Sequence, residues 1–346
     1  MFVPASSRAL HRRWLARRVG IASVLLAGAS LVGLPANAAM ASPSGTATRL
    51  FCMTGSVTNF ANPSIAGPIG ITSGPDRALW FTDNSGDGIG QVTTAGAFNV
   101  FGVPSLNGAN PIGITAGPDG ALWFTNFSDG SIGRITTTGI VTTYSDPTIH
   151  GPMWITTGPD GALWFTNYSS NTIGRITTAG VVTNYSDPSI TGARYITTGP
   201  DGALWFTTGG NTIGRITTKG RVSTYTDPSI NGSIGITAGP HRTLWFTNYY
   251  GNSIGRITTR GVVTTFTDPS INAPLSIAAG PDRTFWFTNS LGNSIGRISN
   301  EGKVTNYSDP SISGPQVITA GRDGAMWFTN FDGNSIGRIT TRHERC

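Results

Sequence analysis

The stretch GPDGALWFTN decides the fold of this chain. It stands at residues 117–126 and again at 158–167, and close variants of it occur five more times. The Trp-Phe pairs inside the phrase follow one another at intervals of 40 to 43 residues, starting at Trp80, Trp123, Trp164, Trp205, Trp245, Trp286 and Trp327. A nearly fixed period of this length indicates a repeat protein with seven units.

Each unit predicts four β-strands. In the unit at 151–190, four short apolar runs occupy residues 154–157, 162–166, 172–177 and 181–185, with Gly-rich turns between them. The runs alternate and are rich in β-branched and aromatic residues, as strands are. Leu163 and Phe165 fall on one face of their strand and Trp164 on the other. Both faces are large and apolar, so we expect other sheets to cover both.

Four strands per unit of this length are typical of a β-propeller, in which each sheet packs on the next. A linear solenoid is the alternative, but it needs polar capping repeats that the chain does not show. The seventh unit stops after its third strand, at residues 334–341, and residues 54–65 match the missing fourth strand. The sequence therefore predicts an all-β, seven-bladed propeller of four-stranded blades, with the ring closed by the N-terminal strand.

The first 38 residues predict a secretory signal peptide. Five arginines precede an apolar run at 20–34, and Ala36-Asn37-Ala38 forms a small-residue cleavage signal. The run is shorter than the roughly 20 residues that span a bilayer. We therefore expect cleavage after Ala38, a propeller domain at 39–346 and a secreted or extracytoplasmic protein, with no transmembrane segment once the signal is removed.

The charge balance argues against a nucleic-acid partner. The formal charge of the whole chain is +6, and it falls to +1 when the five arginines of the signal segment are removed. A basic surface is the electrostatic footprint of nucleic-acid binding. We therefore expect no nucleic-acid partner, and a monomer.

Two cysteines, Cys52 and Cys346, stand near opposite ends of the propeller segment. Ring closure would bring them close together, and an exported protein can keep a disulfide. A Cys52–Cys346 disulfide is one expectation, and two free thiols are the other. Residues 49–53 also resemble a third strand, which leaves the pairing partner of this segment open.

Several residues recur in every unit or nearly so, and the simplest role for them is structural. We expect the Trp of each pair to pack between blades. Six arginines of the IGRI phrase recur together with aspartates of the DPSI-type phrase, which predicts internal ion pairs rather than a free cationic ring. The arginines are Arg134, Arg175, Arg215, Arg256, Arg297 and Arg338, and the aspartates are Asp146, Asp187, Asp227, Asp268 and Asp309.

The position after Trp-Phe-Thr ends the second strand, near one mouth of the predicted channel. Five blades carry asparagine there, and these amides either cap turns or form a polar collar for a ligand or a hydrated cation. Asp83 is the one acidic residue at this position and is the candidate metal ligand. The position holds Asp83, Asn126, Asn167, Thr208, Asn248, Asn289 and Asn330.

A binding site on a ring should appear where the repeat is broken. Two neighbouring units replace the usual PIGIT of the first strand by PMWIT, with Met153 and Trp154, and by ARYIT, with Arg194 and Tyr195. The seventh unit adds Gln316. Aromatic faces with a few polar groups suit a small molecule, a glycan or a peptide. Drift between blades is the alternative explanation.

The phrases ITxGPDGALWFT and N(S/T)IGRITTxG, repeated over nearly the whole chain, resemble the streptogramin B lyases, also called virginiamycin B lyases. The resemblance implies a seven-bladed propeller that opens a cyclic depsipeptide antibiotic by elimination, with Mg²⁺ at the channel mouth. It also implies a catalytic histidine in a P-H-x-I-T phrase and a glutamate in a W-F-x-E phrase.

Neither catalytic residue type is present at its expected position in this chain. The histidine position holds Ile69, Ile112, Met153, Arg194, Ile234, Leu275 and Gln316, and the glutamate position holds the set that begins with Asp83. The sequence therefore favours a lyase-like propeller that binds a ligand at the channel mouth without catalytic residues. The alternative is an active Mg-dependent lyase with a displaced site, for instance around His241.

Overall fold

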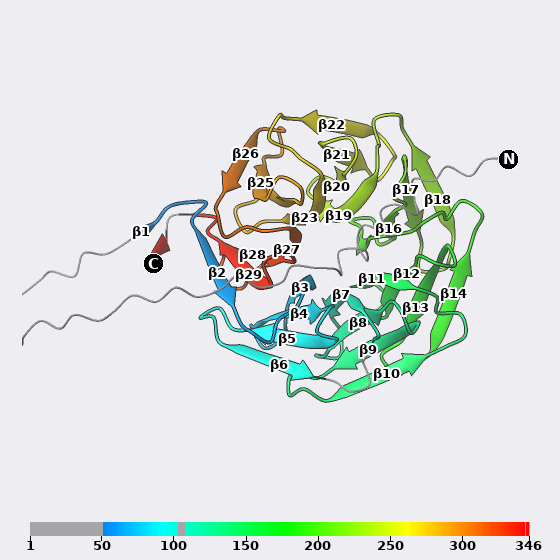
Figure 1. Cartoon of the computed structure of the whole chain (residues 1–346). Helices are drawn as coiled ribbons and strands as arrows, with labels where there is room; N and C mark the ends of the chain where they lie inside the picture. The colour runs from blue at the N-terminus through cyan, green and yellow to red at the C-terminus, as the bar shows by residue number, and fades with distance from the viewer. Residues whose placement is uncertain (1–50, 103–107, 343, 346) are drawn as a thin grey trace, which may run out of the picture. The chain divides into compact units, whose positions relative to one another are not determined.

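The computed structural model describes residues 51–102, 108–342 and 344–345, with only the backbone described at 51–52 and 344–345. In these ranges the regular elements are β-strands, which form seven four-stranded antiparallel sheets and one two-stranded sheet. Figure 1 shows the seven sheets as blades arranged around a ring, which confirms the predicted propeller. Within the described residues, no helix has the length and apolarity to cross a membrane.

Six blades consist of four consecutive strands, and the seventh borrows one strand from the start of the propeller. Blades 1 to 3 comprise β3 (Pro68–Ser73), β4 (Leu79–Asp83), β5 (Gly88–Val92) and β6 (Phe98–Gly102); β7 (Pro111–Ala116), β8 (Leu122–Asn126), β9 (Ser131–Ile135) and β10 (Val141–Ser145); and β11 (Pro152–Thr157), β12 (Leu163–Asn167), β13 (Thr172–Ile176) and β14 (Val182–Ser186). Blades 4 and 5 comprise β15 (Ile196–Thr198), β16 (Leu204–Thr207), β17 (Thr212–Ile216) and β18 (Val222–Thr226); and β19 (Ser233–Gly239), β20 (Thr243–Asn248), β21 (Ser253–Thr258) and β22 (Val263–Thr267). Blades 6 and 7 comprise β23 (Pro274–Ala279), β24 (Phe285–Asn289), β25 (Ser294–Ile298) and β26 (Val304–Ser308); and β27 (Pro315–Ala320), β28 (Met326–Asn330), β29 (Ser335–Ile339) and β2 (Val57–Ala61).

The ring closes as the sequence predicts. Strand β2 pairs antiparallel with β29, with Val57 opposite Ile339 and Ala61 opposite Ser335. A short pair of strands, β1 (Phe51–Cys52) and β30 (Glu344–Arg345), joins the two ends of the described chain again. Cys346 and the side chain of Cys52 lie outside the described residues, so the disulfide remains a prediction.

The hydrophobic core lies between blades rather than within any one of them. Trp80 and Ile89 of blade 1 share a buried cluster with Leu122 and Phe124 of blade 2, and the later blades repeat this arrangement. All seven tryptophans of the Trp-Phe pairs are 0–1% exposed. Each blade therefore needs both of its neighbours to bury its second strand, as expected from the two apolar faces.

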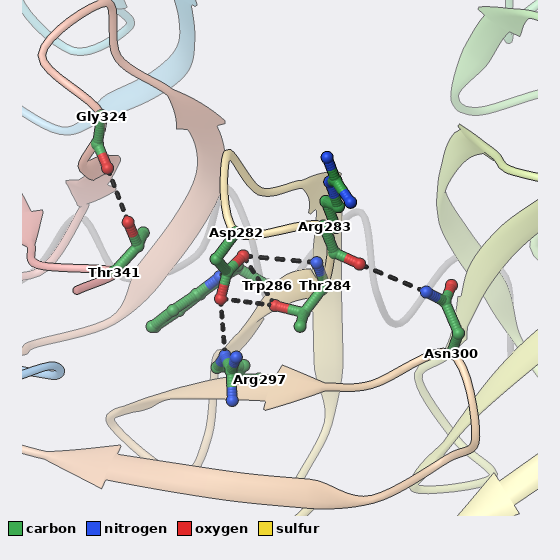
Figure 2. A network of polar contacts seen from close by, with 8 residues as sticks. All are labelled: Asp282, Arg283, Thr284, Trp286, Arg297, Asn300, Gly324 and Thr341. Carbon is green, nitrogen blue, oxygen red and sulfur yellow. Dashed lines mark hydrogen bonds and ion pairs between the residues drawn. The ribbon is translucent and has the colours of Figure 1, made fainter.

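The recurring arginines do form ion pairs, but with an aspartate other than the one the sequence suggested. The carboxylate of the Gly-Pro-Asp turn, or of its Gly-Arg-Asp variant in blade 7, accepts from Arg Nε at 2.6–2.8 Å in five blades. The pairs are Arg134–Asp119, Arg175–Asp160, Arg215–Asp201, Arg297–Asp282 and Arg338–Asp323. The same carboxylate also accepts from the buried Trp Nε1, as Figure 2 shows for Asp282. Antiparallel pairing places each arginine opposite this tryptophan, as with Arg297 and Trp286, and so fixes the partner.

The aspartates of the DPSI-type phrase instead stabilise their own turns. Asp187 accepts from the backbone N–H of Ser189 at 2.9 Å and from its hydroxyl at 2.6 Å. The same two hydrogen bonds recur in four other turns, where the aspartate accepts from the backbone N–H and the hydroxyl of the residue two positions later. These aspartates are Asp146, Asp227, Asp268 and Asp309. These bonds lower the pKa of each carboxyl, since they favour its charged form.

A ring of threonines ties the first strands of all seven blades together. The threonine of each Trp-Phe-Thr phrase accepts a hydrogen bond from its own first strand at 2.8–3.1 Å. It donates another, of 2.6–3.0 Å, to a carbonyl on the first strand of the next blade. These threonines are Thr82, Thr125, Thr166, Thr207, Thr247, Thr288 and Thr329, each with 0% exposure.

Candidate functional site

We use "mouth" for the end of the ring where the first strands begin and the second strands end. Pairing brings these points together, as in Pro111 opposite Asn126. The residue after this proline, or after Ala193 and Ser233 in blades 4 and 5, is the position at which the resemblance implies a histidine. It is buried in blades 1, 2, 5, 6 and 7 but half-buried at Met153 and Arg194. Blades 3 and 4 are therefore where this position can meet a ligand.

Trp154 and Tyr195 form an aromatic pair across the boundary between blades 3 and 4. Their ring centroids lie 3.9 Å apart, with the planes at 21°. Tyr195 is buried, which raises the pKa of its phenol, whereas Trp154 is half-buried. Glycine occupies the same position in blades 1, 2 and 5, where a side chain would collide with the next first strand. The structure thus brings together two of the residues that the sequence singled out.

Arg194 extends this pair with a positive charge. Its guanidinium carbon lies 5.3 Å from the centre of the Tyr168 ring, within the range of a cation–π contact. Its Nε is buried and has no hydrogen-bond partner among the described residues. A side chain at Gly209 would collide with this nitrogen, so the glycine leaves room for the arginine. A buried donor of this kind is costly unless something accepts from it.

Local sequence changes explain why blade 4 presents these side chains. In blade 4, Ala193 replaces the usual proline and Thr208 replaces the usual asparagine. In the other six blades the residues at these two positions are partners at the start of the first strand, and in blade 4 they are not paired. Strand β15 is only three residues long. The backbone is still held, because Arg194 N donates to Thr207 O at 2.8 Å and Thr166 donates to Arg194 O at 2.7 Å. The site is therefore irregular but fixed.

Gln316 and Asn126 do not join this cluster. Gln316 belongs to blade 7, which neighbours blades 6 and 1, and its Oε1 is buried with no hydrogen-bond partner in the part of the chain that the structure describes. Its amide nitrogen donates to Gly314 O at 3.4 Å. Asn126, in blade 2, donates to Ser131 Oγ at 2.9 Å, while its Oδ1 also has no partner among the described residues.

The other four predicted collar asparagines are engaged inside their blades. In Asn248, Oδ1 accepts from Asn231 N at 3.1 Å, and Nδ2 donates to Ser229 O and Ser253 Oγ. Asn167, Asn289 and Asn330 repeat this pattern at the same place. All four are fully buried. Their geometry supports the turn-capping alternative over a ligand collar.

Asp83 takes the place of these asparagines in blade 1. It is 1% exposed, and its Oδ1 accepts from Ala66 N at 2.7 Å. Burial raises the pKa of its carboxyl to about 6, and the backbone hydrogen bond from Ala66 opposes this rise. Among the described residues, no group of three or more His, Cys, Asp or Glu is placed to hold a metal ion. We therefore derive no step through Mg²⁺, and a magnesium site at Asp83 remains a prediction.

The two described histidines lie at different ends of their blades. His241 is exposed in the turn between β19 and β20, at the end of the strands away from the mouth. His150 is exposed on the mouth side, in the segment before β11, and its backbone N–H donates to Asn167 Oδ1 at 3.2 Å. The ring contacts of Trp154, Tyr195 and Arg194 join aromatic and guanidinium groups, which bind ligands but do not abstract protons near neutral pH.

Sequence reasoning missed Tyr168, which follows the Trp-Phe-Thr-Asn phrase of blade 3. Gly209 belongs to the segment TTGGNT at residues 207–212, which is one residue shorter than its counterparts. The sequence predicts a deeper groove at this shortened segment but does not indicate a contact of Gly209 with Arg194. The contact of Arg194 with both depends on how the two blades meet.

Comparisons with known proteins agree with this architecture. The model of the virginiamycin B lyase family matches residues 44–193 and 191–345. A streptogramin B lyase structure is 34% identical over 84% of this chain and 97% of its own, with a TM-score of 0.77. A catalytically inactive histidine-to-alanine virginiamycin B lyase from Staphylococcus aureus, crystallised with quinupristin, is 35% identical over 84% and 99%, also with a TM-score of 0.77.

More distant structures share the fold alone. An extracellular domain of a putative hybrid two-component system from B. thetaiotaomicron is 14% identical, covering 86% of this chain and 44% of its own, with a TM-score of 0.68. The two family matches together span nearly all of the propeller, and the lyase structures align over most of it at more than 30% identity. The chain belongs to the virginiamycin B lyase family.

Proposed function

We propose that this propeller binds a small molecule, a glycan or a peptide at its mouth, between blades 3 and 4. The observation that carries the proposal is the buried Nε of Arg194, a donor to which the described residues supply no acceptor, beside the stacked Trp154 and Tyr195. The half-buried face of Trp154 would pack on a ring or an aliphatic surface of the ligand. Arg194 would donate to a carbonyl, hydroxyl or carboxylate oxygen, and Met153 would adapt to the ligand's shape.

Binding without catalysis fits the residues better than elimination does. Proton abstraction needs a base within hydrogen-bond reach of the substrate. Between blades 3 and 4, the position expected to supply a histidine holds Met153 and Arg194, and the position expected to supply a glutamate holds Asn167 and Thr208. Family membership and the likeness to streptogramin B lyases support the alternative, a lyase that linearises a cyclic depsipeptide with Mg²⁺.

Both functions can be tested on the purified chain with a defined panel of probes: quinupristin, a set of neutral oligosaccharides and a short peptide. A probe that raises the unfolding temperature is then titrated against Arg194→Ala and Trp154→Ala. We expect each variant to lose at least about tenfold in affinity, as loss of an anchoring contact does. Arg221→Ala, an exposed arginine in a turn at the other end of blade 4, is the matched control.

Two results would contradict ligand binding at the mouth, and a third would show that the protein is a lyase. The mouth site is rejected if no probe shifts the unfolding temperature, or if Arg194→Ala binds as the unchanged chain does. Elimination leaves the mass unchanged, so quinupristin incubated with protein and Mg²⁺ is analysed by chromatography that separates cyclic from linear forms. A linear product, lost when Mg²⁺ is chelated, would establish the lyase instead.

We also propose that the protein is exported and acts as a monomer. The segment that carries the expected signal lies outside the described residues, so the support is its sequence alone. N-terminal sequencing of protein recovered from the medium or periplasm should begin at Ala39. Recovery of the intact N-terminus in the cytoplasm would contradict export.

A further inference from the structure

Blade 5 lacks the carboxylate that six other blades place on their buried tryptophan. His241 stands where those blades carry the aspartate of the Gly-Pro-Asp turn or its Gly-Arg-Asp variant. In these six blades the aspartate accepts from Trp Nε1 at 2.9–3.1 Å. In blade 5 the Nε1 of Trp245 is buried and has no partner among the described residues, while Trp245 itself is 1% exposed.

The arginine that should share this carboxylate remains in place. Arg256 lies over Trp245 with its guanidinium carbon 5.6 Å from the ring centre, much as Arg297 lies over Trp286 at 5.8 Å. It forms no ion pair with any residue that the structure describes. The Nη1 of Arg256 donates to Asn300 O at 3.3 Å. This bond does not use the Nε, which is the atom that donates to the aspartate in five other blades. Two donors that elsewhere share one carboxylate thus stand together without it.

The surroundings favour an anion. The sequence from 228 to 267 contains no acidic residue, and Arg242 and Arg260 add exposed positive charge in the two turns at this end of the blade. These turns touch, because Thr259 N donates to Arg242 O at 3.0 Å. In the next blade, Asp282 is already bound to Trp286, Thr284 and Arg297, as Figure 2 shows. Glu301, on the adjoining turn, is exposed and bonded to Ser299.

The turn over this position also differs from its counterparts. His241 and Arg242 both have positive φ, 55° and 58°. In the other six blades the aspartate does not have a positive φ. The residue after it does, as Arg283 shows with a φ of 64°. Residues 240–242 are exposed, whereas Trp245 Nε1 is buried. The turn of blade 5 therefore has its own conformation where the other blades supply the carboxylate, and a ligand reaches Nε1 only through local movement of the protein around it.

We propose that blade 5 carries a binding site for a small carboxylate anion, at the end of the ring away from the mouth. One carboxylate oxygen accepts from Trp245 Nε1 and the other from Arg256 Nε, in the way Asp282 serves Trp286 and Arg297. The fixed spacing of the two donors suits a planar two-oxygen group, which is the carboxylate that six other blades supply from their own chain. This site is independent of the proposed ligand at the mouth.

The test is the unfolding temperature of the purified chain as sodium acetate replaces sodium chloride at constant ionic strength. We expect a rise of about 2–4 °C at an acetate concentration ten times the dissociation constant. In a spectrum of the chain labelled with ¹⁵N-tryptophan, one indole N–H resonance should move with the same concentration dependence. Arg256→Ala, which removes the second donor altogether, should lose the response.

Two turn variants serve as matched partners. His241→Asp with Arg242→Gly rebuilds the turn of the other blades, and it should raise the unfolding temperature and abolish the acetate response. His241→Ala with Arg242→Gly changes the turn without supplying a carboxylate, and it should keep the response. The proposal is overturned by no acetate response in the unchanged chain, by an equal response in all four proteins, or by phosphate acting more strongly than acetate.

Discussion

The hydroxyl of Thr329 donates a hydrogen bond of 2.7 Å to the carbonyl of Ile69, which joins the last blade to the first. The same hydroxyl accepts from Val317 N at 3.1 Å. Thr329 is fully buried, so neither partner can turn to water if the hydroxyl is removed. This contact completes the ring of seven threonines and closes the circle at the level of the first strands.

Thr329→Val should therefore destabilise the protein by about 2–4 kcal/mol, since a buried donor and a buried acceptor lose their partner together. Urea unfolding measures the change in free energy. Thr329→Ser keeps the hydroxyl, so its loss in free energy of unfolding should be clearly smaller. Equal losses in the two variants would show that the methyl group, not the hydrogen bonds, stabilises this junction.

Gly174→Ala should destabilise by about 1–3 kcal/mol, because a methyl group there would collide with the ring of Phe165. Gly210→Ala is the control, since its nearest neighbour would be Thr208 Oγ1 at 3.8 Å and the residue is exposed. It should change stability by less than about 0.5 kcal/mol. Adding Phe165→Leu to Gly174→Ala should recover part of the loss, and two strictly additive losses would contradict the predicted collision.

Asp83 should make stability depend on pH. Its pKa is raised to about 6 in the folded protein, so the folded chain holds the proton more tightly than the unfolded chain. Its contribution is therefore fully present below about pH 4 and is lost as the pH rises through 6, by on the order of 3 kcal/mol.

The matched variant is Asp83→Asn, which carries no titrating group and supplies the side chain found in five other blades. The stability difference between Asp83→Asn and the unchanged chain should shift in favour of the variant as the pH rises from 5 to 8. Urea unfolding at several pH values measures this shift. A difference that stays constant over the range would mean that Asp83 titrates normally.

The carboxylate of Asp282 should contribute more than its charge. Asp282→Asn keeps an oxygen for the N–H of Trp286 but loses the ion pair with Arg297, and it should cost about 1 kcal/mol. Asp282→Ala also removes the partner of a buried indole N–H, and it should cost about 1–3 kcal/mol more. High salt should reduce the cost of both variants relative to the unchanged chain by the same amount, and it should leave the difference between Asp282→Ala and Asp282→Asn unchanged. A full loss already in the Asn variant would assign the effect to charge alone.

The sequence predicts most of the fold because the repeat fixes the period and the strand pattern together. In the unit at 151–190, the four predicted runs correspond to β11, β12, β13 and β14, with ends that differ by at most two residues. The wrong partner for the recurring arginines has a simple cause. Four of the units carry both aspartates, and only the register of β24 and β25 shows which of them faces Arg297.

The site was less accessible to sequence reasoning. The change from Gly to Trp154 and Tyr195 was visible as a break in the repeat, and the structure brings these two rings together. The depth of Arg194 between Tyr168 and Gly209 was not visible, because it depends on the packing of adjacent blades. The asparagines show the opposite case, since recurrence alone cannot separate a buried turn cap from an exposed collar.

The pairing of β2 with β29 has a consequence for synthesis on the ribosome. Thr58 and Arg338 are partners in one sheet although six complete blades lie between them in the sequence. Until β29 has been synthesised, β2 has no strand beside it, and the growing polypeptide exposes unpaired edges that can associate with other chains. Such long-range pairing also slows folding, which lengthens the time for which these edges stay exposed.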